Sequence, residues 1–324
     1  MWESERVTTP AALRPVCVLG LGLIGGSLLR ALHDGGHEAF GYNRSATTVA
    51  EATADGYDAS DDLTATLRRA AAADAVVVLA TPVTTLAPLV QAVADHAPDV
   101  LLTDVVSVKQ SVATIIAETY PGARFVGGHP MAGTSRSGWT ATDPNLFRDA
   151  MWVVMTEDST TVDDWLAVAA IARATGAAVV PAAADAHDRA AAAISHVPHL
   201  TAAVTAAVGG GESDLALRLA AGSFRDGTRV AGTAPALQRA MIEANRIAVL
   251  NALSEIIDRL VNARDDLRDT GTVEVLIDDG HRARQAYAAV ANGPMEPIVD
   301  VEIGAAGWQE ELRRQGHLGR VWLG

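Results

Sequence analysis

The sequence predicts an α/β domain built on a parallel sheet, followed by an all-α domain. Three observations support this prediction. Strand-like and helix-like segments alternate through the first 184 residues, strands almost vanish from Asp185 to about Asn292, and a glycine-rich turn joins the first strand to the first helix. Alternation of this kind is typical of right-handed βαβ units around a parallel sheet.

The alternation can be followed segment by segment. The expected strands are short apolar runs at 16–22, 38–43, 75–81, 100–107, 124–128, 151–156 and 178–181. The expected helices are 25–33, 62–71 (capped by Asp61), 84–97, 109–120 and 162–175. We therefore expect a first domain over 1–184, a helical domain over 185–292, rich in alanine and leucine, and a tail over 293–324.

Composition narrows the class of protein. The formal net charge of −14 argues against nucleic acid or an anionic membrane surface as a partner. Cys17 is the only cysteine, so no intrachain disulfide can form, as is typical of cytosolic proteins. Residues 1–15 carry no apolar signal core, and no apolar run approaches 18 residues. We expect a cytoplasmic protein without membrane partners.

The segment Val16–Leu28 reads VCVLGLGLIGGSL and holds the fingerprint GxGxxG between a strand and a helix. Gly20 permits the tight turn, Gly22 lets the backbone approach a pyrophosphate, and Gly25 lets the helix pack closely on the strand. The N–H groups at the start of the helix would hold the phosphates. This predicts a Rossmann-type domain. Its expected cofactor contacts are Gly20, Gly22, Leu23, Ile24, Gly25 and Thr81.

The end of the second strand bears on the choice between NAD and NADP. An acidic residue there would bond the ribose 2′-hydroxyl and repel a 2′-phosphate, but the chain has Asn43, Arg44 and Ser45. Arg44 and Ser45 could bind the phosphate, which favours NADP or the use of both cofactors. The alternative is that Asn43 bonds the ribose of NAD while Arg44 is a solvated surface charge.

Two further motifs close strands of the same sheet, where ligands bind. In Asp104–Lys109, Ser107 and Lys109 would face the cofactor crevice; the alternative is a helix-capping serine and a surface lysine. In the GGHPMAGT segment, His129 stands between two glycines and a proline. Histidine is well suited to accept a proton near neutral pH, so His129 is the expected base. The alternative is a structural loop histidine.

Two motifs belong to the helical region. In SHVPH, His196 and His199 are three residues apart and could share a helix face. No third ligand with suitable spacing supports a metal site. For His196, packing at the start of a helix is the simpler interpretation. In FRDGTR, Arg225 and Arg229 could bind a carboxylate, and Asp226 could pair with Arg229. Solvated helix charges are the alternative.

Together GLGLIGGS, DVVSVK, GGHPMAGT, SHVPH and FRDGTR, over roughly residues 15–290, resemble the prephenate dehydrogenase family, which includes arogenate dehydrogenases. The resemblance implies a Rossmann domain joined to a helical dimerisation domain, and hence a homodimer. It also implies oxidative decarboxylation of prephenate to 4-hydroxyphenylpyruvate with NAD(P), in tyrosine biosynthesis. Arogenate is the alternative substrate.

The resemblance assigns roles residue by residue. His129 would accept the proton of the substrate's 4-hydroxyl, and Ser107 would hydrogen-bond that hydroxyl. The expected substrate-binding residues are Lys109, Ser135, His199, Asp226 and Arg229. Ser135 stands where some members have Glu, and Gln238 where some have Trp, which leaves the side-chain specificity open.

Two rival functions remain. A β-hydroxyacid dehydrogenase or imine reductase would share the architecture, but the former needs a lysine in its second domain and none follows Lys109. A non-catalytic nucleotide-binding regulator would keep the glycines without needing His129 and Arg229 in one crevice.

Overall fold

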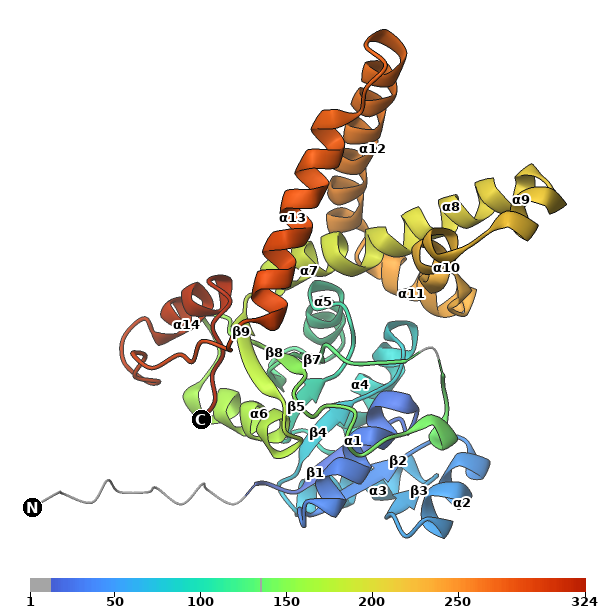
Figure 1. The fold of residues 1–324 in the computed structure, drawn as a ribbon. Helices are drawn as coiled ribbons and strands as arrows, with labels where there is room; N and C mark the ends of the chain where they lie inside the picture. The colour runs from blue at the N-terminus through green and yellow to red at the C-terminus, as the bar shows by residue number, and fades with distance from the viewer. Residues whose placement is uncertain (1–12, 135) are drawn as a thin grey trace, which may run out of the picture.

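The computed structural model describes residues 13–134 and 136–324, and it has a sheet domain below and long helices that project from it (Figure 1). Residues 1–12, where we expect no secretory signal, lie outside the described residues. The main sheet is parallel, with the order β3-β2-β1-β4-β5-β6. Its strands are β1 (Val16–Leu19), β2 (Ala39–Tyr42), β3 (Ala59–Ser60), β4 (Val76–Leu79), β5 (Leu101–Asp104) and β6 (Arg124–Phe125).

Helices connect these strands on both faces and confirm the predicted Rossmann-type architecture. They are α1 (Leu23–Asp34), α2 (Ala46–Ala54), α3 (Leu63–Ala72), α4 (Leu86–His96) and α5 (Gln110–Thr119). The sequence analysis missed α2 and β3. It also placed the cap of α3 one residue early, because Asp62, not Asp61, accepts a hydrogen bond from the Ala65 N–H, at 2.9 Å.

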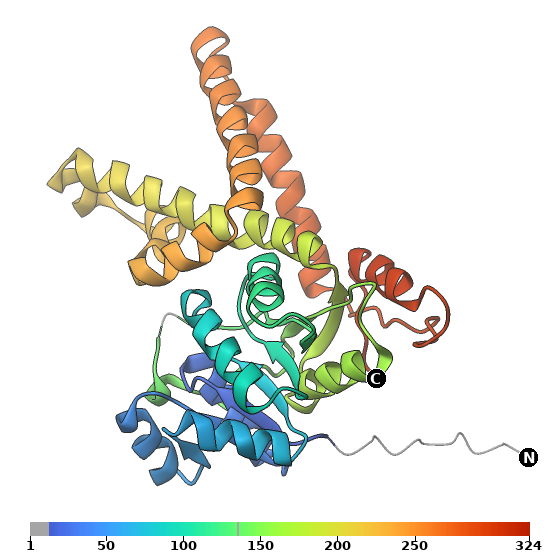
Figure 2. The same cartoon turned by 180° about the vertical axis from the view of Figure 1, so that it is seen from behind.

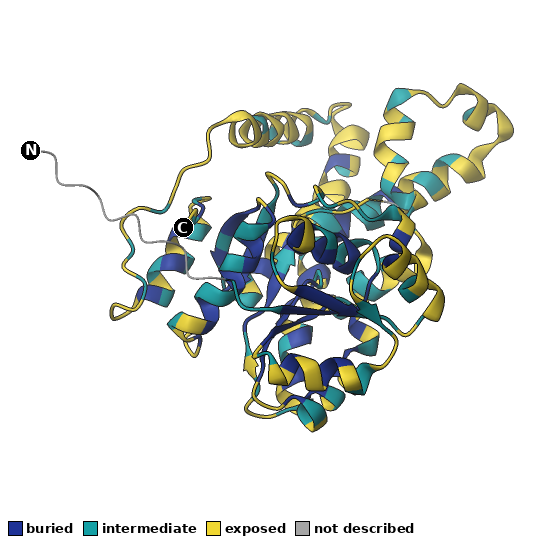
Figure 3. Ribbon diagram, turned by 90° about the horizontal axis from the view of Figure 1, so that it is seen from below, coloured by how far each residue is buried: buried dark blue, intermediate teal, exposed yellow. Residues whose placement is uncertain are grey.

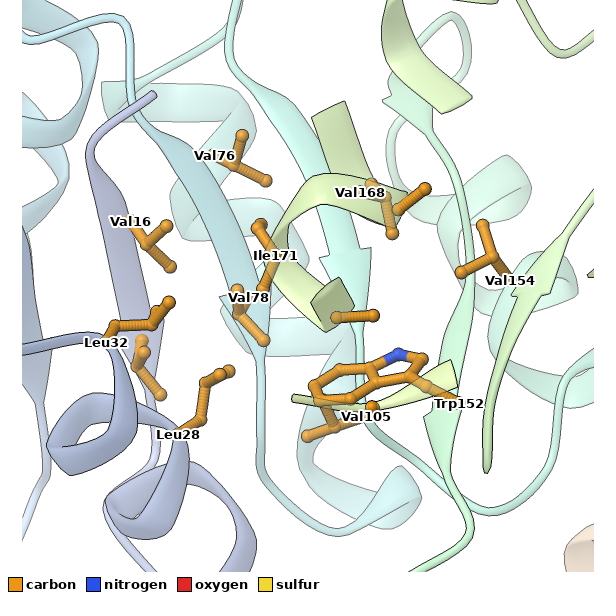
Figure 4. Packing of buried hydrophobic residues seen from close by; sticks show 14 of the residues in the cluster. Val16, Leu28, Leu32, Val76, Val78, Val105, Trp152, Val154, Val168 and Ile171 are labelled. Carbon is orange, nitrogen blue, oxygen red and sulfur yellow. The ribbon is translucent and has the colours of Figure 1, made fainter. Parts of the chain in front are cut away.

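Both faces of the main sheet are buried, as expected for parallel strands covered by helices. Alternate residues of each strand point to opposite faces. Val16, Val76 and Val78 meet Leu28 and Leu32 of α1 on one face (Figure 4). Cys17, Val77 and Leu79 pack on the other face against α3, α4 and α5. The buried Cys17 thus has a packing role.

A second sheet was not predicted as separate. It contains β7 (Gly128–Pro130), antiparallel to β8 (Met151–Met155), which is parallel to β9 (Ala178–Ala182) and joined to it by α6 (Val162–Ala174). The predicted single strand 124–128 is therefore wrong: the chain leaves the main sheet after Val126, whose N–H donates to Leu102. The long segment between β7 and β8 runs over α1, where the Asp143 N–H donates to Ser27 Oγ at 2.9 Å.

The helical region begins with a nearly continuous rod. It consists of α7 (Ala184–Ala191), a π-helical turn (Ala192–His196) and α8 (Val197–Glu212). Pro198 has no N–H to donate to the carbonyl of Ile194, which explains the wider turn just before it. The remaining elements are α9 (Asp214–Leu219), α10 (Gly222–Thr228), the 3-10 turn Arg229–Gly232, α11 (Pro235–Ala244), α12 (Arg246–Asp269) and α13 (Glu274–Asn292).

The helices form two arms that diverge from the sheet domain, α8–α11 in one and α12–α13 in the other (Figure 2). Much of both arms is exposed (Figure 3). Contrary to expectation, the stretch Ala184–Glu212 is long and apolar enough to cross a membrane by length and composition alone. Core helices satisfy the same criterion, and polar residues of this stretch hydrogen-bond to α5 and to the N-cap of α12, as described below.

The tail returns to the small sheet. After α13 the chain forms α14 (Trp308–His317), and Trp322 then exchanges backbone hydrogen bonds with Val179 of β9, at 2.8 and 3.2 Å. Trp308 and Trp322 both pack edge-on against Trp165 of α6, with ring centroids 6.1 and 5.1 Å away. Residues after Asn292 therefore pack against the sheet domain rather than against the helical arms.

Candidate active site

The glycine turn has the form that the fingerprint predicts. Gly20 has a φ of +111°, and a Cβ there would lie 2.7 Å from the Ala80 carbonyl oxygen. A Cβ at Gly25 would lie 1.9 Å from the Gly20 carbonyl oxygen, so α1 can pack this closely only with glycine. These contacts agree with a tight turn at Gly20 and close helix packing at Gly25; binding of a cofactor by either residue stays a prediction.

The start of α1 fits a dinucleotide pyrophosphate. Its N-cap is Gly22, which has no side chain to satisfy the first N–H groups, and its first turn contains no acidic residue. A Cβ at Gly22 would meet no atom within 4 Å, so the backbone is open at this point. At the end of β4, Thr81 Oγ1 is buried and has no hydrogen-bond partner among the described residues. Free N–H groups and the positive helix end are what a phosphate binds.

The end of β2 presents the three residues predicted for the adenosine side. Asn43 donates its N–H to Ser60 at 3.0 Å, and Arg44 is exposed. Ser45 is the N-cap of α2, since its Oγ accepts from the Thr48 N–H at 3.3 Å. Its hydroxyl proton remains a donor, and the positive end of α2 lies beside it.

Lys109 does not face the crevice as predicted. It is the only lysine of the chain and is only 2% exposed. Its Nζ donates to the Asp104 carboxylate and, at 2.7 Å, to the Gly128 carbonyl oxygen. Burial lowers the pKa of the Lys109 ammonium, and the adjacent Asp104 opposes that shift. The expectation of a substrate contact is therefore corrected: Lys109 joins the end of β5 to the strand that carries His129.

His129 is the first member of a hydrogen-bonded chain. Its Nδ1 lies 2.8 Å from His187 Nε2, and His187 Nδ1 lies 2.8 Å from Asp188 Oδ1. The Asp188 carboxylate also accepts from the N–H groups of Lys109, at 2.8 Å, and Gln110, at 2.9 Å, at the start of α5. The chain thus joins β7 of the sheet domain to α7 of the helical region and to α5, which faces α7 in Figure 1.

The pKa shifts within the hydrogen-bonded series His129–His187–Asp188 favour a neutral imidazole at His129 and an ionised carboxylate at Asp188. Burial lowers the pKa of His129 well below its usual 6.5, and the neighbouring His187, Lys109 and His196 lower it further. Burial acts to raise the pKa of Asp188, but hydrogen bonds from His187 and from the two backbone N–H groups outweigh it and leave this pKa below its usual value. Near pH 7 His129 is therefore neutral and Asp188 ionised.

His196 lies behind this chain as a buried structural residue. Asn245, the N-cap of α12, donates through Nδ2 to the Asp188 carbonyl oxygen at 2.8 Å and to His196 Nδ1 at 3.1 Å. Burial lowers the pKa of His196 to about 4. The packing reading of His196 is confirmed. Among residues 13–134 and 136–324, no cluster of three or more His, Cys, Asp or Glu could hold a metal.

Ser107 and His199 remain candidates for the substrate side. Ser107 lies partly buried in the turn between β5 and Lys109, two residues before the buried lysine. His199 lies on α8, and within residues 13–134 and 136–324 its buried Nδ1 has no hydrogen-bond partner. An unsatisfied buried nitrogen is costly unless a ligand or water completes it.

The segment predicted to bind a carboxylate, residues 224–229, differs from the prediction in one pairing. Asp226 accepts from Arg225 Nε at 3.1 Å rather than pairing with Arg229, because the two neighbours share an exposed helix end. Arg229 is exposed and begins the 3-10 turn that ends at Gly232. Gln238 holds this turn, donating through Nε2 to the Thr233 carbonyl oxygen at 2.7 Å. Ser135 lies outside the described residues.

His187, Asp188 and Asn245 were not predicted from the sequence. They hydrogen-bond to residues 49 to 79 positions away, so spacing alone could not find them. The available signal was the adjacent His-Asp pair near the start of an alanine-rich helix, where a carboxylate is expensive to bury without partners.

The sequence of this chain matches family models and curated relatives. Residues 28–180 match the family model described as the nucleotide-binding domain of prephenate dehydrogenase, and residues 183–277 match the model of its dimerization domain. Prephenate dehydrogenase of Bacillus subtilis is 31% identical over 261 residues, which cover 77% of this chain and 69% of the relative.

Two solved structures extend the comparison. A protein of Corynebacterium glutamicum, whose prephenate dehydrogenase assignment is provisional, is 45% identical with a TM-score of 0.91, covering 96% of this chain and 99% of its own. Arogenate dehydrogenase of Synechocystis is 30% identical with a TM-score of 0.73, covering 84% of this chain and 99% of its own. With both family models matched in order and a relative 31% identical, this chain belongs to the prephenate dehydrogenase family of nicotinamide-dependent dehydrogenases.

Proposed function

We propose that this chain converts prephenate to 4-hydroxyphenylpyruvate and carbon dioxide, with His129 as the proton acceptor. The observation that carries the proposal is the position and state of His129. It lies partly exposed on β7, which Lys109 ties to the carboxyl end of β5, and its lowered pKa keeps it neutral. A neutral imidazole held beside the carboxyl end of β5 is suited to take a hydroxyl proton.

The other residues would hold and orient the substrate. A bound nicotinamide supplies the acceptor for the hydride that leaves the carbon bearing the 4-hydroxyl. His129 takes the hydroxyl proton, and Ser107 hydrogen-bonds the same oxygen. Loss of the ring carboxylate as carbon dioxide leaves a phenolate, to which His129 returns its proton, so no net proton is released. Arg229 would bind a substrate carboxylate and His199 would orient the side-chain end.

The choice of cofactor rests on the end of β2. No carboxylate there repels a 2′-phosphate, Arg44 is exposed and free to meet one, and Ser45 retains a hydroxyl proton to donate. The positive end of α2, unknown from the sequence alone, favours the same anion. We therefore propose that NADP is used at least as well as NAD.

Initial rates with prephenate and arogenate, each crossed with NAD and NADP, test these proposals together. We expect turnover with prephenate, and similar or faster rates with NADP. Faster turnover with arogenate would support the alternative dehydrogenase. No turnover in any combination, with cofactor still bound, would support the non-catalytic nucleotide-binding regulator.

The helical arms support a homodimer. Large apolar side chains are exposed along both arms, including Val208 of α8, Leu250 of α12 and Val290 of α13, which is 80% exposed. Such a density of exposed apolar side chains is typical of an interaction surface. The matched dimerization-domain model supports a second copy of this chain as the partner. The negative charge and the single buried cysteine support a cytoplasmic protein with a small-molecule substrate and no nucleic acid partner.

A further inference from the structure

We propose that His187 and Asp188 are positioning residues that fix the tautomer of His129, with the proton on Nδ1 and a bare Nε2. The catalytic consequence rests on the proposed function of His129, but the tautomer itself does not. The inference follows from the direction in which each hydrogen bond of the chain must run.

Asp188 sets the direction. An ionised carboxylate only accepts, and here it already accepts two backbone N–H groups from the start of α5. His187 Nδ1, 2.8 Å from the same carboxylate, must therefore carry the proton and donate it. The other nitrogen of a neutral His187, Nε2, is then a bare acceptor.

His129 is the hydrogen-bond donor to the bare Nε2 of His187. Its Nδ1 lies 2.8 Å from the bare Nε2 of His187, so that Nδ1 carries the proton and donates. The two rings meet edge to face, with an interplanar angle of 77°, as an in-plane hydrogen bond between neighbouring imidazoles permits. The free electron pair of His129 is on Nε2, the nitrogen that the chain leaves open for the substrate hydroxyl.

The other polar groups nearby hydrogen-bond elsewhere and leave the His129–His187–Asp188 hydrogen bonds intact. Lys109 Nζ is committed to Asp104 and the Gly128 carbonyl oxygen. Asn245 and His196 form their own pair on the Asp188 carbonyl oxygen, away from the carboxylate. When His129 becomes an imidazolium, its Nδ1–H donates more strongly to His187, and the Asp188 anion beyond it stabilises the positive charge. His187 and Asp188 come from α7, so the helical region orients a base on the sheet domain.

The tautomer can be measured without turnover. In protein with ¹⁵N-labelled histidine, near neutral pH and without substrate, we expect the His129 resonances to show a protonated Nδ1 and a bare Nε2; His129→Asn assigns them. In Asp188→Asn the amide can donate to His187 Nδ1, which reverses the chain and moves the His129 proton to Nε2. A wild-type His129 protonated on Nε2 would overturn the proposal, whatever the enzyme's substrate proves to be.

Kinetics then test the consequence. His187→Leu removes the acceptor, and we expect kcat to fall on the order of 10²-fold with KM changed less than about twofold. His187→Gln, whose Oε1 can accept from His129 Nδ1, should recover much of that loss. His187 is 5% exposed but lines a hollow of about 900 Å³ between α7 and α14. Free imidazole should reach the space left in His187→Gly and restore part of kcat.

His317→Leu is the matched control, because His317 lines the same hollow from α14 but is not one of the hydrogen-bonded residues His129, His187 and Asp188. It should keep the wild-type kcat. If His187→Leu keeps the wild-type kcat while prephenate is turned over, the catalytic consequence is refuted. Absence of turnover by the wild type would refute the proposed function instead, and the ¹⁵N measurement would still decide the tautomer.

Discussion

At the scale of single residues, the proposed base His129 is oriented by hydrogen bonds through His187 to the Asp188 carboxylate. His129 could be named as a candidate base from its sequence context, between a diglycine and a proline, although the structure places it within β7 rather than at a strand end. The role predicted for Lys109 was wrong. A lysine at a strand end suggests a ligand contact, but in the structure its side chain is buried against Asp104. His187 and Asp188 act through hydrogen bonds to residues distant in sequence, and no local pattern encodes those bonds.

The lowered pKa of His129 predicts an acid limit to activity. The base works only when deprotonated, so kcat/KM should rise with pH through the pKa of His129 and be level above it. Because burial lowers that pKa, the midpoint should lie below 6.5. A pH profile of kcat/KM measures it. A midpoint at or above 6.5 would contradict the buried, neutral state described for His129.

Arg229→Ala should weaken substrate binding about 10- to 100-fold, because a hydrogen bond to a charged group contributes a free energy of about that size. Cofactor affinity should hardly change. Substrate KM and cofactor titration measure the two effects. Arg225→Ala is the matched control, because Arg225 lies in the same segment but is paired with Asp226. Equal loss of both ligands in Arg229→Ala would show that Arg229 supports the fold instead.

At the scale of elements, strands bounded by glycine or proline could be predicted from the sequence. Helix α2, the separate second sheet and the packing of the tail could not, because no clear local sequence pattern marks them. Residues 46–54 lack a clear apolar face, and only Ser45 as a potential cap signalled α2. The second sheet depends on the chain leaving the main sheet at Val126, a tertiary event. The tail is held by tryptophans that meet Trp165 across more than 140 residues.

The start of α2 makes the cofactor prediction specific. Arg44→Ala should lower kcat/KM for NADP about 5- to 150-fold, as expected for 1–3 kcal/mol from a contact to a charged group, and leave NAD little changed. Asn43→Asp should shift preference toward NAD by adding a ribose acceptor and a repulsive charge. Rates with both cofactors measure the ratio.

Arg68→Ala, another exposed arginine but on α3, is the control for net charge. A wild-type preference for NAD of tenfold or more, unaltered in Arg44→Ala, would refute this account of the β2 end. The family membership would stand, because it rests on other residues.

At the scale of the whole molecule, the two arms diverge and are largely exposed (Figure 3). Large apolar side chains are among their exposed residues. The sequence predicted this surface from its alanine and leucine content, but not the division into two arms. A second copy that covers the arms would account for their exposure.

Light scattering at micromolar concentration should give twice the chain mass of 33.6 kDa. Leu250→Asp on α12 should shift the mass toward the single chain, since a charge buried without a partner opposes association. Gln285→Asp, a polar position on α13, adds the same charge and is the control. A wild-type mass near 33.6 kDa would rule out the dimer.

Oxidative decarboxylation with His129 as the base can be tested by measuring the stoichiometry of the products. Carbon dioxide and reduced nicotinamide are measured together during turnover of prephenate by the wild type and by His129→Asn. We predict one of each per prephenate consumed, and a parallel fall of both rates by roughly 10²- to 10⁴-fold in the variant, with KM little changed. Reduction of the cofactor without release of carbon dioxide, or a variant that keeps more than about half of the wild-type kcat, would contradict the account.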